Sequence, residues 1–334
     1  RLPHLLVSIV ISCIRFRNRD NKSVIVYAID FAKAFDKVRQ AKLFEKYADL
    51  NLPDFVYNWL VNFFQNRSHC TRFGNQTSDM AEITASIVQG SGVGPVSYDV
   101  TASDLHPVSL LNVIVKFADD TYLIIPETNQ STCQMEINHI EQWAEDNNLT
   151  LNRLKSLEIV FVKPRTRRQV HIPPPAVDGF ARVEQITALG VTFSQNFAVT
   201  GHVNKIITGC ATILYALRTL KAHGLPQHAL QLIFRSTAIA KIMYAAPAWW
   251  GFATAADHKR LQTFLLRAGK SGYYADPHLP VVSLFEEADT RFFDSVCSNS
   301  EHPLQRLLPA KRVSLYDMRP RSHAFELPKK QTVL

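Results

Sequence analysis

The stretch Val113–Ile125, which reads VIVKFADDTYLII, decides how this chain folds. Two apolar runs of β-type composition flank Ala118-Asp119-Asp120, so the stretch predicts a hairpin with two neighbouring carboxylates at its turn. Adjacent aspartates repel each other, and a cation close to both would relieve that repulsion. The alternative is ordinary turn chemistry, because Asp side chains hydrogen-bond to turn backbone.

A second stretch, Ser23–Asp36 (SVIVYAIDFAKAFD), favours the metal interpretation. A strand-like run ends at Asp30, and a helix is predicted just beyond it. If this strand pairs with the hairpin in one sheet, Asp30 lies beside Asp119, and carboxylate oxygens are the ligands that Mg²⁺ and Mn²⁺ prefer. Two such ions can hold the attacking and leaving oxygens of a phosphoryl transfer.

A glycine-rich turn, Gln89–Pro95 (QGSGVGP), lies between these two stretches and would let the backbone approach a ligand closely. The motifs follow one another in the order Asp30…Asp36, Gln89-Gly90-Ser91, Phe117-Ala118-Asp119-Asp120, Leu151-Asn152…Lys155 and Leu189-Gly190-Val191. With this order, the sequence from about residue 5 to about residue 300 resembles the reverse transcriptases of non-LTR (LINE-type) retrotransposons.

The resemblance implies an α+β fold, in which a polymerase palm of antiparallel sheet packed on helices is followed by an α-helical thumb. It implies an RNA-directed DNA polymerase that transfers nucleotides to a primer 3′-hydroxyl with two divalent ions, Mg²⁺ or Mn²⁺. The partners implied are an RNA template, a DNA primer and deoxynucleoside triphosphates. No protein partner is indicated.

The resemblance also assigns roles to residues. Asp30, Asp119 and Asp120 would be catalytic metal ligands, and Lys155 would protonate the leaving pyrophosphate, although it could equally be a solvated surface lysine. Phe35 would lie beneath the sugar of the incoming nucleotide and exclude a 2′-hydroxyl, or else be an ordinary core aromatic. The substrate-binding residues implied are Phe31, which would add its backbone carbonyl to the metal ligands, together with Phe35, Gln89, Gly90 and Ser91.

The sequence departs from the family pattern at three places. Val88 replaces a usual proline, Gly92-Val93 replaces a bulkier aliphatic pair, and Phe117 stands where many relatives have tyrosine. The extra backbone freedom at Gly92 bears on the rigidity of the glycine-rich turn.

Charge is unevenly distributed along the chain. Residues 1–162 carry 15 Lys and Arg against 18 Asp and Glu, a net charge of −3, whereas residues 163–334 carry 22 against 11, a net charge of +11. The basic half is suited to facing nucleic-acid phosphates, although each cation alone could be a solvated surface charge. The candidates for phosphate contacts are Lys205, Arg218, Lys221, Lys259, Arg260 and Arg267.

Composition excludes several classes of protein. With 334 residues and 46% hydrophobic content, the chain can bury a sizeable core and is not disordered. Its five cysteines are too widely spaced to indicate zinc or a disulfide framework, which favours a reducing intracellular compartment, the cytoplasm or the nucleus. The apolar run Leu5–Ile14 is far shorter than the roughly 20 residues of a membrane span, so no membrane is expected as a partner.

Periodicity predicts the remaining elements and four regions. Helices are expected at residues 5–13, 37–50, 54–64 and 131–147, and a strand at 156–162. Further helices are expected at 203–220, from Pro226 to a close at Pro247, and at 256–268. Two of these helices have predicted inward faces. Phe55, Val56, Trp59, Leu60, Phe63 and Phe64 are expected to be core rather than a nucleic-acid stacking platform, and Met135, Ile140, Trp143 and Ala144 are expected to point inward.

The regions are a palm with a remnant of fingers at 1–165, a linker and primer-grip-like hairpin at 166–195, a helical thumb at 196–271, and a tail at 272–334 for which no structure is predicted. Only 29 residues precede Asp30, and Arg1 is not a methionine. Since relatives place fingers ahead of this point, we expect a fragment or an amino-terminally decayed copy.

Two other functions remain open at the level of sequence. One is a catalytically inactive, nucleic-acid-binding remnant of such an element. The other, a Mg²⁺-dependent phosphatase or nuclease, explains the carboxylates but neither the Gln89-Gly90-Ser91 turn nor the thumb.

Overall fold

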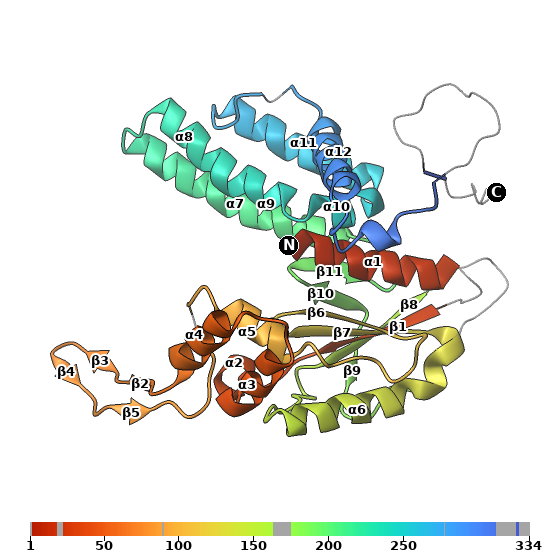
Figure 1. Ribbon diagram of the computed structural model, residues 1–334. Coiled ribbons are helices and arrows are strands. Elements are labelled where there is room, and N and C mark those ends of the chain that lie inside the picture. Colours follow the sequence, from red (N-terminus) through yellow and green to blue (C-terminus); the bar gives the residue numbers. More distant parts are fainter. Residues whose placement is uncertain are drawn as a thin grey trace.

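The fold is centred on a five-stranded sheet with the strand order β6-β7-β1-β8-β9 (Figure 1). The computed structural model describes residues 2–18, 23–88, 90–162, 175–276, 278–311 and 325–326. The central strand β1 pairs antiparallel with both β7 and β8, and only the short β9 is parallel to its neighbour. The strands are β1 (Ser23–Ile29), β6 (Val113–Phe117), β7 (Asp120–Pro126), β8 (Leu157–Val162) and β9 (Ala181–Arg182).

Strand β1 separates two hydrophobic cores. Successive side chains of a strand point to opposite faces, so Val24 and Val26 enter one core while Ile25, Tyr27 and Ile29 enter the other. This burial on both faces explains why the strand reads as a continuous apolar run rather than an alternating one. The predicted α+β fold, an antiparallel sheet packed on helices, is confirmed.

Five helices cover the face that receives Ile25 and Tyr27. They confirm the predictions at 37–50, 54–64 and 131–147, and Asn148, with a left-handed φ of 59°, follows the last of them. The segment after Pro95 begins as a helix and continues as a loop. The helices are α2 (Ala34–Lys37), α3 (Gln40–Ala48), α4 (Asp54–Phe64), α5 (Gly94–Thr101) and α6 (Cys133–Asp146).

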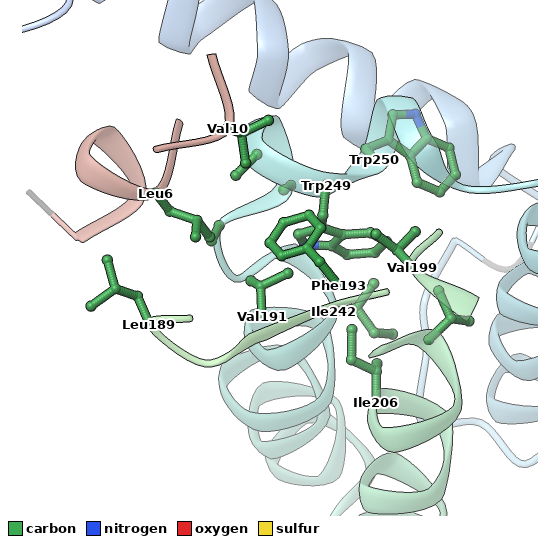
Figure 2. Close-up of a cluster of buried hydrophobic side chains, with 14 of the residues drawn as sticks. Leu6, Val10, Leu189, Val191, Phe193, Val199, Ile206, Ile242, Trp249 and Trp250 are labelled. Atoms are coloured by element: carbon green, nitrogen blue, oxygen red, sulfur yellow. The ribbon is translucent and has the colours of Figure 1, made fainter. Parts of the chain in front are cut away.

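The opposite face carries one continuous core that joins α1 (Leu2–Asn18), a hairpin and a helical bundle (Figure 2). The hairpin consists of β10 (Gln185–Ala188) and β11 (Val191–Ser194), as predicted. Leu6 and Val10 of α1 point toward the hairpin and toward Trp249, which is fully buried. The bundle comprises α7 (Thr200–Ala222), α8 (Gln227–Phe234), α9 (Ala240–Met243), α10 (Ala246–Trp249), α11 (Ala255–Lys270) and α12 (Val281–Ser298).

One prediction about the bundle was wrong. Helix α9 ends at Met243, and Pro247 lies in the first turn of α10 instead of closing the helix before it, because the first turn has no intrahelical use for the missing N–H. The tail, for which no structure was predicted, contains α12, in which Val281, Phe285 and Val296 are buried. This helix packs against α10 and α11.

Two predictions about buried faces were also wrong. On α4, Leu60 and Phe64 are buried, but Phe55 is 76% exposed and Trp59 is 54% exposed. On α6, Met135 is 44% exposed. Helical spacing places side chains on one stripe, but it does not say how much of that stripe a neighbouring element covers.

An arm of four short strands follows α4 and projects away from the sheet (Figure 1). Its two ladders pair β2 with β5 and β3 with β4, and all of its strand residues are exposed. The strands are β2 (Ser68–His69), β3 (Arg72–Phe73), β4 (Gln76–Thr77) and β5 (Ala81–Glu82).

Residues 163–174 of the predicted linker lie outside the described residues, and the four predicted regions stay a prediction. None of the five cysteines takes part in a disulfide. Throughout the described ranges, none of the helices combines the length and apolar character that crossing a bilayer needs.

Candidate active site

A cleft of about 370 Å³ opens at the carboxyl end of β1. Ile29 is paired with Thr121, so the chain leaves β1 beside the turn that joins β6 and β7. Three separate segments of sequence therefore meet at this cleft. Its lining comprises Asp30, Phe31, Ala32, Lys33, Ala34, Phe35, Asp36, Asp119, Asn152 and Lys155.

The backbone around Asp30 is held by the loop before β8. The Asp30 N–H donates to Ser156 Oγ at 3.0 Å, and the Asp30 carbonyl accepts from the Asn152 N–H at 2.8 Å. The carbonyl of Phe31 accepts no backbone hydrogen bond within the described residues, which leaves it available to a ligand. The Phe31 ring is buried against Trp143, with centroids 5.9 Å apart, so only its backbone can serve a substrate.

The hairpin turn presents Asp119 to solvent. Phe117 pairs with Asp120, so the turn consists of Ala118 and Asp119, and Ala118 adopts a left-handed φ of 50°. Asp120 is the first residue of β7 and does not line the cleft. Partial desolvation, followed by the charges of Asp119 and Asp30, raises the pKa of the Asp120 carboxyl. The charges of Asp119 and Asp30 therefore disfavour the ionised form of Asp120.

The donor set fits a divalent cation that arrives with substrate. Counting only residues that the structure describes, no three His, Cys, Asp or Glu side chains form a complete metal-binding group, and no ion pair involves Asp30, Asp119 or Asp120. Mg²⁺ is usually held by one or two carboxylates together with substrate phosphates and waters. Asp30 and Asp119 on one cleft meet that requirement.

Phe35 is positioned by a neighbour that sequence reasoning missed. Its ring stacks on Tyr98 of α5, with centroids 4.8 Å apart and an interplanar angle of 25°. Tyr98 is buried, and burial together with the charge of Asp119 raises the pKa of its phenol. The Phe35 carbonyl accepts from the Ile87 N–H at 2.9 Å, which fixes the backbone beneath the ring.

Two lysines flank the carboxylates in the cleft. Lys155 was predicted, but Lys33 was missed; both are exposed. The signal for Lys33 was its place inside the Asp30…Asp36 motif, three residues after the aspartate. Its left-handed φ of 52° belongs to the sharp turn that starts α2.

The glycine-rich turn lies apart from the cleft lining. Gly90 has a φ of 79° and is exposed, a conformation that glycine adopts without strain. The Ser91 hydroxyl donates to the Val88 carbonyl at 2.7 Å and accepts from the Gly94 N–H at 3.0 Å, so it stabilises the start of α5. Gln89 lies outside the described residues. The predicted substrate contacts of this turn stay predictions.

Only three of the six predicted phosphate-binding residues lie together. Lys259, Arg260 and Arg267 of α11 line a hollow of about 290 Å³ together with Ile207 of α7. Arg260 lies 3.5 Å from Asp257 across one helical turn. The remaining three are separate: Lys205 donates to Thr192 Oγ1 at 3.0 Å, Lys221 donates to the Ser271 carbonyl at 3.1 Å, and Arg218 is exposed on α7.

The tip of the β10–β11 hairpin is tied to both sides of the molecule. The Leu189 N–H donates to Tyr122 Oη at 3.3 Å, and the Leu189 carbonyl accepts from Tyr244 Oη at 3.0 Å. Tyr122 lies on β7, two residues beyond Asp120. The hairpin is therefore coupled to the strand that carries the acidic turn.

The comparison with known families now decides the identity of this fold. The profile of the family described as "Reverse transcriptase (RNA-dependent DNA polymerase)" matches residues 4–193. The chain belongs to the reverse transcriptase family. The matched range contains all three segments of the cleft and ends within the hairpin. Reverse transcriptases generally use divalent metal ions, in agreement with the acidic cleft.

This reverse transcriptase is similar to enzymes of Drosophila melanogaster mobile elements. It is 27% identical over 201 residues to the RNA-directed DNA polymerase from mobile element jockey, covering 56% of this chain and 21% of the relative. It is 26% identical over 256 residues to the probable RNA-directed DNA polymerase from transposon X-element, covering 70% and 26%. The chain thus spans about a fifth to a quarter of these relatives. The predicted resemblance to LINE-type reverse transcriptases is confirmed.

Among solved structures, the reverse transcriptase is similar to a telomerase from Candida tropicalis in complex with a fragment of telomeric RNA. The identity is 10%, the TM-score is 0.47, and the match covers 90% of this chain and 51% of that chain.

Proposed function

We propose that this domain is the RNA-directed DNA polymerase of a non-LTR retrotransposon, which adds deoxynucleotides to the 3′-hydroxyl of a DNA primer paired with an RNA template. The observation that carries the proposal is the convergence of Asp30 and Asp119, from two neighbouring strands, on one cleft that also contains Lys33 and Lys155. Separated carboxylates and ammonium groups in one cleft suit a substrate that brings both cations and a triphosphate.

We infer that Asp30, Asp119 and the Phe31 carbonyl would hold two Mg²⁺ or Mn²⁺ ions, with Asp120 supporting them. Bound ions of this kind lower the pKa of the primer hydroxyl and neutralise charge on the departing pyrophosphate. Ser156 and Asn152 hold the Asp30 backbone, so the chain that carries this carboxylate is already in position when substrate arrives.

The two lysines act on the triphosphate. Their ammonium groups balance phosphate charge inside the cleft, and Lys155 can donate a proton to pyrophosphate as it leaves. Lys33 lies three residues after Asp30 and lines the same cleft, which supports its assignment to the triphosphate.

Phe35→Val is expected to weaken discrimination against ribonucleotides roughly tenfold or more. The phenylalanine ring is clamped on Tyr98, so its removal opens space that a 2′-hydroxyl can enter. The measurement is the ratio of kcat/KM for a deoxynucleotide to that for the matching ribonucleotide. Phe44→Val, in the same core but away from the cleft, serves as the control. A ratio that does not change would return Phe35 to a purely structural role.

The hollow on α11 supports binding of the template–primer duplex. Replacing Lys259, Arg260 and Arg267 together with glutamine is expected to weaken duplex binding and to lower the slope of log K against log salt by about 3, one for each phosphate that is no longer neutralised. The measurement is affinity for an RNA–DNA duplex at several salt concentrations. Arg291→Gln, at an exposed Arg–Glu pair on α12, is the control. An unchanged salt slope would show that the duplex does not bind at this surface.

The inactive remnant remains the second candidate, because binding through α11 requires no catalysis. Primer extension distinguishes the two. Family membership disfavours the phosphatase or nuclease alternative. A cytoplasmic or nuclear location, and the division into palm, hairpin, thumb and tail, are retained as part of this proposal.

A further inference from the structure

The solvent-facing side of α4 carries large aromatic side chains that the proposed polymerase chemistry does not use. Phe55 is 76% exposed and Trp59 is 54% exposed. Burial of such large aromatic rings would stabilise the fold. Neither residue lines the acidic cleft or the basic hollow on α11. An exposed aromatic cluster of this kind marks a binding surface.

The rings form an ordered row. Trp59 and Phe63 are stacked with centroids 5.5 Å apart and an interplanar angle of 24°. The Arg67 guanidinium lies over the Phe63 ring at 4.6 Å, and its Nε donates to the Phe63 carbonyl at 2.6 Å. Phe55, Trp59 and Phe63 follow one another at intervals of four residues, which places them along one side of α4, and Arg67, three residues beyond the end of the helix, folds back over Phe63.

The chemistry of this row matches unpaired nucleobases. Between the rings, Asn58 and Asn62 are exposed one helical turn apart, and each amide offers both donors and an acceptor. Lysine and glutamate are absent from α4, so this is not an ordinary charged, solvated face. Stacking on aromatic rings and Arg planes, with hydrogen bonds to base edges, is how proteins bind single-stranded RNA.

The row packs on the same hydrophobic core as Phe35 of the cleft. Phe63 packs edge-on against buried Phe64 at 5.1 Å, and the chain that returns from the arm donates from Ile87 to the Phe35 carbonyl at the cleft wall. Figure 1 shows α4 and α7–α8 reaching past the same end of the sheet, with α4 on the side of α2 and α3. Helix α4 and the basic bundle therefore lie on opposite sides of the sheet.

We propose that the row Phe55-Trp59-Phe63-Arg67 is a platform for single-stranded RNA, on which bases stack and Arg67 contacts phosphate. Resting on the proposed polymerase function, this strand is the unpaired template that has not yet been copied. The bundle would hold duplex, whereas α4 would hold single strand.

Trp59 is itself the reporter for the test. The chain has four tryptophans, and the other three, Trp143, Trp249 and Trp250, are at most 7% exposed. Titration with an oligouridylate of roughly 12 nucleotides, within the span of one single-strand site, is expected to quench tryptophan fluorescence through Trp59. Fluorescence anisotropy of labelled RNA then gives the affinity independently.

The variants separate stacking from general disturbance. Trp59→Ala is expected to weaken oligouridylate binding about tenfold, and Trp59→Phe to retain it, because base stacking needs a ring rather than an indole. Duplex affinity should stay unchanged in both. The control, Leu110→Ala, removes a fully exposed apolar side chain elsewhere and should change neither affinity.

Each outcome is decisive. Oligouridylate affinity that does not change in Trp59→Ala overturns the platform and leaves the proposed polymerase untouched if the duplex still binds. Trp59-dependent self-association in sedimentation, without RNA binding, assigns the face to a second copy and also overturns it. If the unaltered chain does not bind the duplex, that result contradicts the proposed function instead.

Discussion

Asp119→Asn is expected to lower primer extension by roughly a thousandfold, the effect of losing several kcal/mol of transition-state stabilisation. The carboxylate lies on the exposed two-residue turn and lines the cleft with Asp30, so the substitution removes charge without removing packing. Asp30→Asn should behave alike. Duplex affinity should change less than about twofold, because phosphate contacts do not depend on these carboxylates.

The measurement is incorporation of deoxynucleotides on an RNA template with Mg²⁺ or Mn²⁺, accompanied by titration of Mn²⁺ in the presence of nucleotide. Asp294→Asn, the same change at an exposed site on α12, is the control. Wild-type extension by Asp119→Asn would contradict the two-carboxylate site. Tight Mn²⁺ binding that depends on Asp119 without any extension by the unaltered chain would instead support the inactive remnant.

Trp249→Ala is expected to lower the free energy of unfolding by about 3–5 kcal/mol, the usual cost of deleting a buried large aromatic. The Trp249 ring is fully buried and lies edge-on to His202 at 5.0 Å and to Phe285 at 5.3 Å. Its indole N–H also donates to the Tyr244 carbonyl at 3.0 Å, and that acceptor would lose its partner. The loss combines a cavity with a broken hydrogen bond.

Urea unfolding followed by circular dichroism measures this change, and Trp59→Ala is the matched control. Because Trp59 is 54% exposed, its substitution should change stability by less than about 0.5 kcal/mol. Equal stabilities for the two variants would refute the assignment of Trp249 to the core that joins α1, the hairpin and the bundle.

The catalytic part of the fold could be predicted because its signals are local. Strands β1, β6 and β7 are short apolar runs bounded by Asp30 and by the Ala118-Asp119 turn, and such runs have few alternatives. The order of motifs then predicted the family, and the family match confirmed it. Lys33 was overlooked because its place inside the Asp30…Asp36 motif does not by itself show that it lines a cleft.

Other features could not be predicted because they depend on partners that are distant in sequence. Tyr98 supports Phe35 from 63 positions later, and no local pattern relates the two residues. Helix α12 lies in a tail for which no structure was predicted, and it packs against α10 and α11. Tertiary packing routinely outweighs such local preferences.

The sequence by itself determined strands β1 and β8, the acidic turn after Phe117 and the excess positive charge of the second half, since each is a property of consecutive residues or of composition. Only the tertiary structure decided which side of each helix meets a neighbour. Phe55, Trp59 and Phe64 share a helix and an aromatic character, yet α3 and its core cover Phe64 alone. Burial depends on the surface that another element presents, and that surface exists only once the chain has folded.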